Sequence, residues 1–237
     1  MRIYEDLWSE AVAAFDQGQP RVDPHLLDLP NDHRRGVSLV FRPPPAVQAR
    51  VADFLHALAA EFPNQYFYQP RELHVTVLTY VPATELWRRE MGEVRAFRAL
   101  TAEVAGRHRP FPVAFRGVTA APNAVMIQGF PLDGGLDDLR AELRRVFVER
   151  GFPGRLDRRY PNRAAHVTAM RFARSEADWQ RLKAIVAANR QTDFGRMRVD
   201  TLELLWSDWY ASAASARTFQ KFSLPEAPGA GPETGIS

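Results

Sequence analysis

The sequence predicts an α+β protein of two pseudo-symmetric lobes, each an antiparallel sheet with helices on its outside. The tripeptide His-Val-Thr occurs twice within apolar runs, as ELHVTVLTY at 72–80 and AAHVTAMRF at 164–172, although the chain has only six histidines. Each copy follows a strand and a helix, and each is followed by a helix and a strand. Two copies of one unit are expected to pack about a pseudo-twofold axis, with the His-Val-Thr strands facing a central cleft.

Residues 1–35 are predicted to form a helix and a connector ahead of this repeat. Apolar residues recur at helical spacing in the first turns, in a stripe made of Leu7, Trp8, Ala11, Val12 and Phe15. The segment that follows is rich in proline and aspartate, which indicates an irregular connector.

The repeat covers residues 36–224, with lobes of about 36–122 and 123–224 between which strands can be exchanged. Around the first His-Val-Thr strand we expect a strand at 36–41, a helix at 46–62, a helix at 85–106 and a strand at 111–118. Around the second we expect a strand at 123–130, a helix at 136–151, a helix at 176–189 and strands at 196–206 and 217–224. The Pro- and Gly-rich segment 225–237 is predicted to be a disordered tail.

Composition excludes several classes of protein. With 237 residues, 46% hydrophobic and 25% charged, the chain resembles an ordinary globular domain. A net charge of +3 does not indicate a broad surface for long nucleic acids. The absence of cysteine excludes thiol nucleophiles, zinc–thiolate sites and disulfides. Without a signal peptide or a long apolar run, we expect a monomeric cytoplasmic protein that does not contact membranes.

The two tripeptides carry the chemistry of the predicted cleft. On a strand, residues i and i+2 share a face, so His74 and Thr76 lie together, as do His166 and Thr168. One neutral imidazole can take a proton from an attacking oxygen while a protonated imidazole supplies one to the leaving oxygen. Threonine hydroxyls can hydrogen-bond the non-bridging oxygens of a phosphodiester. These residues need no metal and no other cofactor for such a reaction.

A structural role for these side chains is the main alternative. A single His-x-Thr on a half-buried strand is more often structural than catalytic. Two copies at equivalent positions of an internal repeat favour the functional interpretation instead. No third ligand for zinc is evident near either histidine, and Glu72, the acid nearest to His74, cannot make a site alone.

Two His-x-Thr motifs in tandem resemble the two-histidine phosphoesterase superfamily, which includes the bacterial RNA 2′,3′-cyclic phosphodiesterases, once called 2′-5′ RNA ligases. The resemblance spans about residues 36–224 by motif order, although only the two His-Val-Thr blocks are specific. It implies that His74 and His166 form the acid–base pair and that Thr76 and Thr168 bind phosphate. Residues 1–35 have no counterpart in the minimal family pattern, and they either cover the core or restrict the cleft.

Further contacts with substrate are expected around the motifs. Arg171 matches an arginine of the family after the second motif, but strict alternation points it away from His166 unless the strand bulges. Tyr66 and Tyr68 are candidates for stacking on a nucleobase, with core packing as the alternative. The loop 154–163 offers further cations to a phosphate-rich ligand: Arg155, Arg158, Arg159 and Arg163.

The function implied by the resemblance is metal-independent hydrolysis of a 2′,3′-cyclic phosphate, on an RNA end or a nucleotide, to a 2′-phosphate. Cleavage or formation of 2′-5′ linkages is the alternative within the same chemistry. A nucleotide-binding protein without catalytic activity is the alternative from another class.

Overall fold

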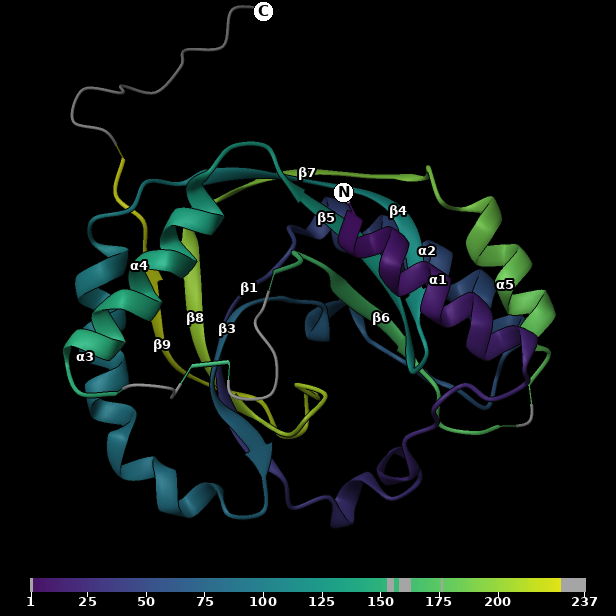
Figure 1. The fold of residues 1–237 in the computed structure, drawn as a ribbon, viewed down its shortest axis with the longest axis horizontal. Coiled ribbons are helices and arrows are strands. Elements are labelled where there is room, and N and C mark those ends of the chain that lie inside the picture. The colour runs from purple at the N-terminus through teal and green to yellow at the C-terminus, as the bar shows by residue number, and fades with distance from the viewer. Residues whose placement is uncertain (1, 153–155, 158–162, 176, 227–237) are drawn as a thin grey trace, which may run out of the picture.

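The computed structural model describes residues 2–152, 156–157, 163–175 and 177–226. Its strands form one curled, antiparallel, nine-stranded sheet with helices on its outside (Figure 1). This arrangement confirms the predicted α+β class. Within the described residues, no helix is both long enough and apolar enough to cross a membrane.

The sheet has the strand order β7-β4-β5-β6-β3-β1-β8-β9, and the short β2 pairs with β6 beside this path. The strands are β1 (Arg35–Phe41), β2 (Tyr66–Phe67), β3 (Val75–Thr84), β4 (Phe111–Ala121), β5 (Ala124–Pro131), β6 (Val167–Arg171), β7 (Asp193–Val199), β8 (Thr201–Ser207) and β9 (Arg217–Ser223). The two His-Val-Thr strands, β3 and β6, are therefore neighbours at the centre of the sheet. Strands from both halves of the sequence contribute to β3-β1-β8-β9.

The helices are α1 (Arg2–Asp16), α2 (Pro45–Glu61), α3 (Val94–Ala105), α4 (Gly135–Glu149) and α5 (Trp179–Ala188). In Figure 1, α3 and α4 cover the part of the sheet that holds β3, β8 and β9, whereas α1, α2 and α5 lie over the part that holds β4 to β7. Each helix buries an apolar stripe, and most of the buried side chains form one large core.

Two segments differ from the prediction. The helix expected at 85–106 is α-helical only from Val94, because residues 87–93 form 3-10 turns that contain Gly92, a poor helix former. The strand expected at 196–206 is two strands, β7 and β8, which lie in opposite parts of the sheet. The break falls at Asp200, a residue type that strands disfavour, and the chain crosses there from one part of the sheet to the other.

The N-terminal helix α1 packs on β4 and α5, so it covers part of the core. The connector after it contains short 3-10 turns at Pro24–Leu27 and Leu29–Asn31. The predicted disordered tail begins at residue 225, and its residues 227–237 lie outside the described residues.

Candidate active site

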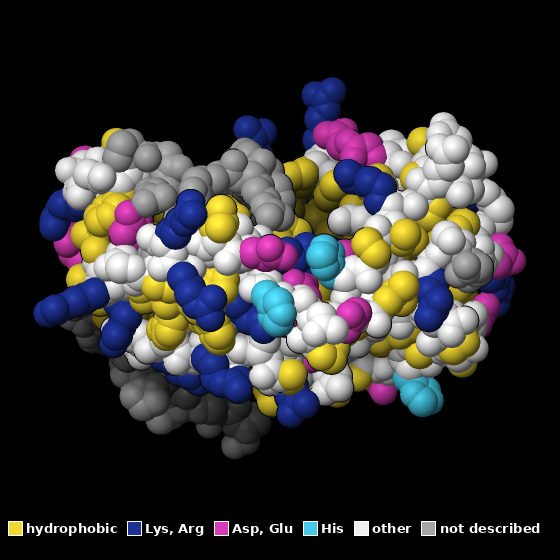
Figure 2. Space-filling model, turned by 90° about the horizontal axis from the view of Figure 1, so that it is seen from below, with side chains coloured by type: hydrophobic (Ala, Val, Ile, Leu, Met, Phe, Trp, Pro, Cys, Tyr) yellow, Lys and Arg dark blue, Asp and Glu magenta, His cyan; other side chains and the backbone are white. Residues whose placement is uncertain are grey.

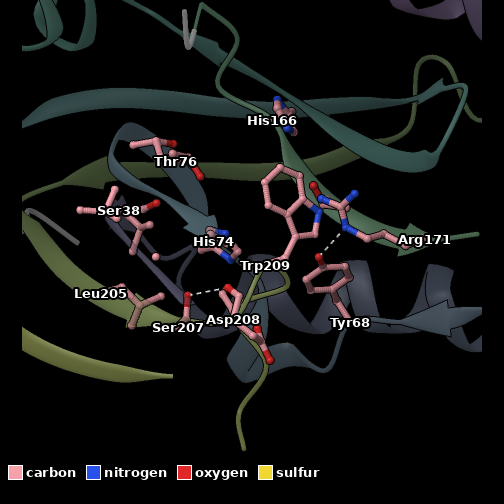
Figure 3. Close-up of a pocket in the computed structure, with 17 residues that line it drawn as sticks. Ser38, Tyr68, His74, Thr76, His166, Arg171, Leu205, Ser207, Asp208 and Trp209 are labelled. Atoms are coloured by element: carbon pink, nitrogen blue, oxygen red, sulfur yellow. Dashed lines mark hydrogen bonds between the residues drawn. The ribbon is translucent and has the colours of Figure 1, made fainter. Parts of the chain in front are cut away.

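The two His-Val-Thr strands pair with each other over a very short distance. β3 and β6 pair only at Val75 and Val167, the central residues of the two tripeptides. The valines are buried, and the flanking histidines and threonines are half-buried on the other face, as period-2 alternation predicts. One cavity of about 100 Å³ is lined by His74, Thr76, His166 and Thr168 together, so the structure brings the four predicted residues to one place. Figure 3 labels His74, Thr76 and His166 around it.

The ring of His74 is oriented by the main chain. Its Nδ1 lies 2.7 Å from the carbonyl oxygen of Glu72, so Nδ1–H is the donor. In the neutral ring this tautomer leaves a lone pair on Nε2, which is the form a general base requires. Burial lowers the pKa of His74 to about 4, although the bond to the Glu72 carbonyl favours the charged ring; the charges of Arg42 and Arg171 lower it further.

His166 has a different environment. Its Nδ1 is buried and has no hydrogen-bond partner among the described residues. The carbonyl of Ala164, which corresponds by sequence to that of Glu72, accepts a hydrogen bond from Arg140 instead. Burial lowers the pKa of His166 to about 4, with further lowering by Arg171, His74 and Arg140. Both rings are therefore neutral at pH 7 in the unliganded protein, and only the tautomer of His74 is fixed by a partner.

These lowered pKa values predict a specific loss of stability in acid. The unfolded histidines take up protons near pH 6.5, but the folded ones only near 4, so stability falls as the pH drops through that interval. In a His74→Gln/His166→Gln variant, we expect the fall between pH 7 and pH 4.5 to be smaller by on the order of 1–3 kcal/mol. Urea unfolding at the two pH values measures this. His56→Gln, on the exposed face of α2, is the control, and an unchanged fall in the double variant would contradict the expectation.

A pair of equivalent bulges completes the cavity. Opposite β1, Leu39 pairs with Leu78 and Val40 with Thr76, so Val77 is an extra residue in β3. Opposite β5, Val125 pairs with Met170 and Met126 with Thr168, so Ala169 is an extra residue in β6. Both extra residues follow the threonine of the motif directly. After each bulge, the side chains that face the cavity are those that strict alternation would place on the opposite face.

After the bulges, Thr79 and Arg171 lie on the same face as the motif threonines, and both line the cavity. Arg171 therefore lines the site because β6 bulges, which is the condition that the sequence analysis set for it. Its Nε donates to the hydroxyl of Tyr68 at 2.9 Å, and its guanidinium lies 5.9 Å from the centre of the Trp209 ring (Figure 3). A cation beside two hydroxyls and two imidazoles suits an anionic phosphodiester.

The two candidate tyrosines have different positions. Tyr68 lines the cavity, but it is only 3% exposed, and its hydroxyl accepts a hydrogen bond from Arg171. Little of its ring is therefore accessible for stacking on a base. Tyr66 does not line this cavity, and it packs against Tyr68 and Tyr210. Glu72 does not line it either, because its carboxylate accepts from the backbone N–H groups of Gln69 and Ala213. Of the arginine loop, Arg155, Arg158 and Arg159 lie outside the described residues.

The segment after β8 was not identified from the sequence. Asp208 and Trp209 line the cavity together with Ser38 of β1 and Ser207 of β8 (Figure 3). The Asp208 carboxylate accepts from the N–H groups of Tyr210 and Ser212 at 3.0 Å each, and this holds the loop in place. The sequence signal was the run SDWY, in which a tryptophan follows an aspartate directly after a strand. The loop reaches the site only because β8 lies beside β1.

Arg140 was also missed, although its position in the sequence is unusual. It occupies a core position of α4, between Leu136 and Leu143, and is only 1% exposed. Its Nε donates to the carbonyl of Val77 at 3.0 Å, and one terminal nitrogen donates to those of Thr76 and Ala164 at 3.0 and 2.9 Å. The guanidinium thus bridges the backbones of the two motif strands where their own ladder ends.

The cavity contains no evident site for a metal. Among the described residues, no group of three or more His, Asp or Glu side chains is placed to hold an ion. The chemistry that the cavity offers is proton transfer by two imidazoles beside hydroxyls and one guanidinium.

Comparison with known proteins agrees with this geometry. The sequence model of the 2′-5′ RNA ligase superfamily matches residues 43–210, which include both motifs, Arg171 and Trp209. No curated protein sequence matches the chain significantly.

Solved structures share the fold. The crystal structure of TT0787 of Thermus thermophilus has a TM-score of 0.60 and 19% sequence identity, over 80% of this chain and 97% of that one. E. coli LigT complexed with 3′-AMP has a TM-score of 0.55 and 16% identity, over 81% of this chain and 99% of that one. The complex of LigT with NADP+ gives 0.54 and 16%, over 81% and 98%. At these identities the likeness establishes the fold.

Proposed function

The chain belongs to the 2′-5′ RNA ligase superfamily, and on that premise we propose that it is a metal-independent phosphodiesterase that opens 2′,3′-cyclic phosphates of RNA ends or nucleotides. The observation that supports this best is the convergence of His74, Thr76, His166 and Thr168 on one cavity. A pair of imidazoles can supply both a base and an acid, which a phosphodiester needs and a purely binding site does not.

Different hydrogen bonding assigns different roles to the two histidines in this proposal. His74 is the base, because the Glu72 carbonyl fixes the tautomer with a lone pair on Nε2. It takes a proton from water while the water oxygen bonds to phosphorus. The bond from phosphorus to the 3′ oxygen breaks, and His166 gives its proton to that oxygen. The product is a 2′-phosphate with a free 3′ hydroxyl, and proton exchange with solvent restores both rings.

The negative charge of the bound phosphodiester favours the protonated form of His166 that this cycle needs. Arg171 lowers the pKa of His166 in the unliganded protein. A bound phosphodiester anion next to Arg171 offsets that charge and raises the pKa of His166, so the ring becomes protonated when substrate is present. The hydroxyls of Thr76 and Thr168 then hydrogen-bond the non-bridging oxygens, where negative charge increases in the transition state.

A substrate panel tests the function. It compares nucleoside 2′,3′-cyclic phosphates, RNA with a cyclic end, 2′-5′ oligoadenylate and ADP-ribose cyclic phosphate. The proposal expects turnover of a cyclic phosphate, with the 2′-phosphate identified by phosphorus NMR. Turnover of 2′-5′ oligoadenylate alone would favour the alternative within the same chemistry. Binding without turnover, unaffected by replacing either histidine, would favour a non-catalytic nucleotide-binding protein.

Activity is expected to survive excess EDTA, because the proposed proton transfers use only side chains of the chain itself. The rate on the best substrate of the panel is measured before and after dialysis against chelator. Loss of activity that zinc or manganese restores would contradict the metal-independent mechanism.

A further inference from the structure

A second, larger cavity opens directly beside the proposed active site. Its volume is about 420 Å³, against about 100 Å³ for the first. Four residues line both cavities, which are therefore adjacent: His166, Thr168, Arg171 and Trp209. The smaller cavity can hold a phosphate group, whereas the larger one is in the range of pockets that bind small organic molecules.

The far wall of this second cavity is built by residues 1–35. Ile3, Leu7 and Glu10 of α1 and Arg21 of the connector line it, together with residues of the β4–β5 hairpin. The connector is tied to that hairpin, because the backbone N–H of Arg21 donates to the carbonyl of Pro122 at 2.7 Å. The extension thus does more than cover the core, since without it the cavity would have no wall on this side.

Helix α1 is held firmly in this position. The buried Tyr4 hydroxyl donates to the carbonyl of Gly129 at 2.9 Å and accepts from its N–H at 3.1 Å. Gly129 is required there, because a Cβ atom would lie 1.8 Å from the carbonyl oxygen of Ala165, the residue before His166. Tyr4 therefore fixes α1 against β5, which pairs with the strand of the second motif, and Leu7 lies about one helical turn further on.

The chemistry of the cavity suits a nucleoside. Leu7 packs on the small apolar cluster of Ala121, Ala124 and Met126, and all four residues line the cavity, so part of its wall is apolar and suits an aromatic base. The arginines of the lining, Arg21, Arg163 and Arg171, offer donors to base edges, ribose hydroxyls or a further phosphate. Among the described side chains on the face shown in Figure 2, basic ones are interspersed with acidic and apolar ones and form no continuous track for a long strand.

We propose that this second cavity binds the nucleoside that carries the reacting phosphate, and that α1 determines which nucleosides fit. The occupant follows from the residues that the two cavities share: a phosphodiester held by His166, Thr168 and Arg171 lies directly beside the second cavity, where its attached nucleoside can be accommodated. The inference rests on the proposed function for the identity of the phosphate, but the affinity for a nucleoside can be measured without turnover.

The test compares two ligands by calorimetry with the full chain. Adenosine 2′-phosphate probes both cavities, and inorganic phosphate probes the first one only. In the wild type, adenosine 2′-phosphate should bind more tightly than phosphate. Leu7→Glu should reduce this preference about tenfold, because a carboxylate replaces an apolar contact with the base. Val148→Glu makes a similar change on α4 at a side chain that is 56% exposed, and it should leave the preference unchanged.

Each outcome decides the inference. No preference for the nucleotide in the wild type, or the same preference in Leu7→Glu, would overturn it. If Leu7→Glu lowers the melting temperature, Leu7→Ala replaces it, with an expected loss of about threefold. A preference that depends on Leu7 in a protein that hydrolyses nothing on the panel would support the nucleoside site and reject the proposed function.

Discussion

Replacing either His74 or His166 with alanine is expected to lower kcat/KM on the best substrate by on the order of 100-fold or more, the usual loss for a missing acid or base. The double variant should be little worse than either single one, because the two groups act in one concerted step and their effects are not additive. Thr76→Ala and Thr168→Ala should be milder, since each removes one hydrogen bond to the phosphate. Steady-state kinetics on the five variants measures these losses.

The pH dependence distinguishes the two histidines. The proposed mechanism needs His74 neutral and His166 protonated, and both have pKa values lowered to about 4 in the free protein. The kcat/KM profile should therefore fall as the pH rises above this range, whereas kcat should reach its optimum at higher pH, because bound phosphate raises the pKa of His166. His166→Ala should remove the alkaline limb and His74→Ala the acid limb.

Folding must be checked in the same variants. Far-UV circular dichroism and melting temperature at pH 7 should barely change, because the rings lie at a cavity and contribute little packing. A His→Ala variant that keeps a near-native rate would refute the assignment. A variant that unfolds would be replaced by His→Gln, which keeps most of the volume of the side chain.

The placement of the motif residues at one cavity could be predicted from the sequence because local rules determine it. Alternation along a strand places His and Thr on one face, and the repeat brings two such faces together. The same rule left the direction of Arg171 open, because a bulge interrupts the alternation there, and it gave one strand at 196–206 where the structure has two. No local signal marks Ala169 as the extra residue whose bulge directs Arg171 toward the site. The break at Asp200 depends on how the two parts of the sheet close.

Other parts of the site depend on contacts between distant segments. Trp209 reaches the cavity because β8 pairs with β1, and Tyr4 meets Gly129 across 125 residues of sequence. Arg140 is intermediate, since an arginine in the apolar stripe of a helix is visible in the sequence. The partners of Arg140 cannot be predicted from the sequence, because they are backbone carbonyl groups, which every residue has.

Arg140→Met is expected to destabilise the protein by about 3–5 kcal/mol, as the loss of one partner of a buried charged contact usually does. Buried ion pairs can often be exchanged for apolar residues, because both partners are removed together. Here the acceptors are the carbonyls of Thr76, Val77 and Ala164, which no side-chain substitution removes, so methionine leaves them unsatisfied. Urea unfolding measures the loss, and Arg145→Met, on the exposed face of the same helix, is the control.

Arg140 should also affect catalysis, because its guanidinium joins the strands that carry His74 and His166. Arg140→Lys keeps the charge but cannot donate to all of these carbonyls at once, and we expect a fold that is retained with kcat lowered about tenfold. In Arg140→Met, removal of the positive charge should raise the pKa of His166 and move the alkaline limb to higher pH. Destabilisation alone would not move that limb. Stability within about 1 kcal/mol of the wild type in Arg140→Met, together with an unshifted profile, would show that the guanidinium does not position the two strands.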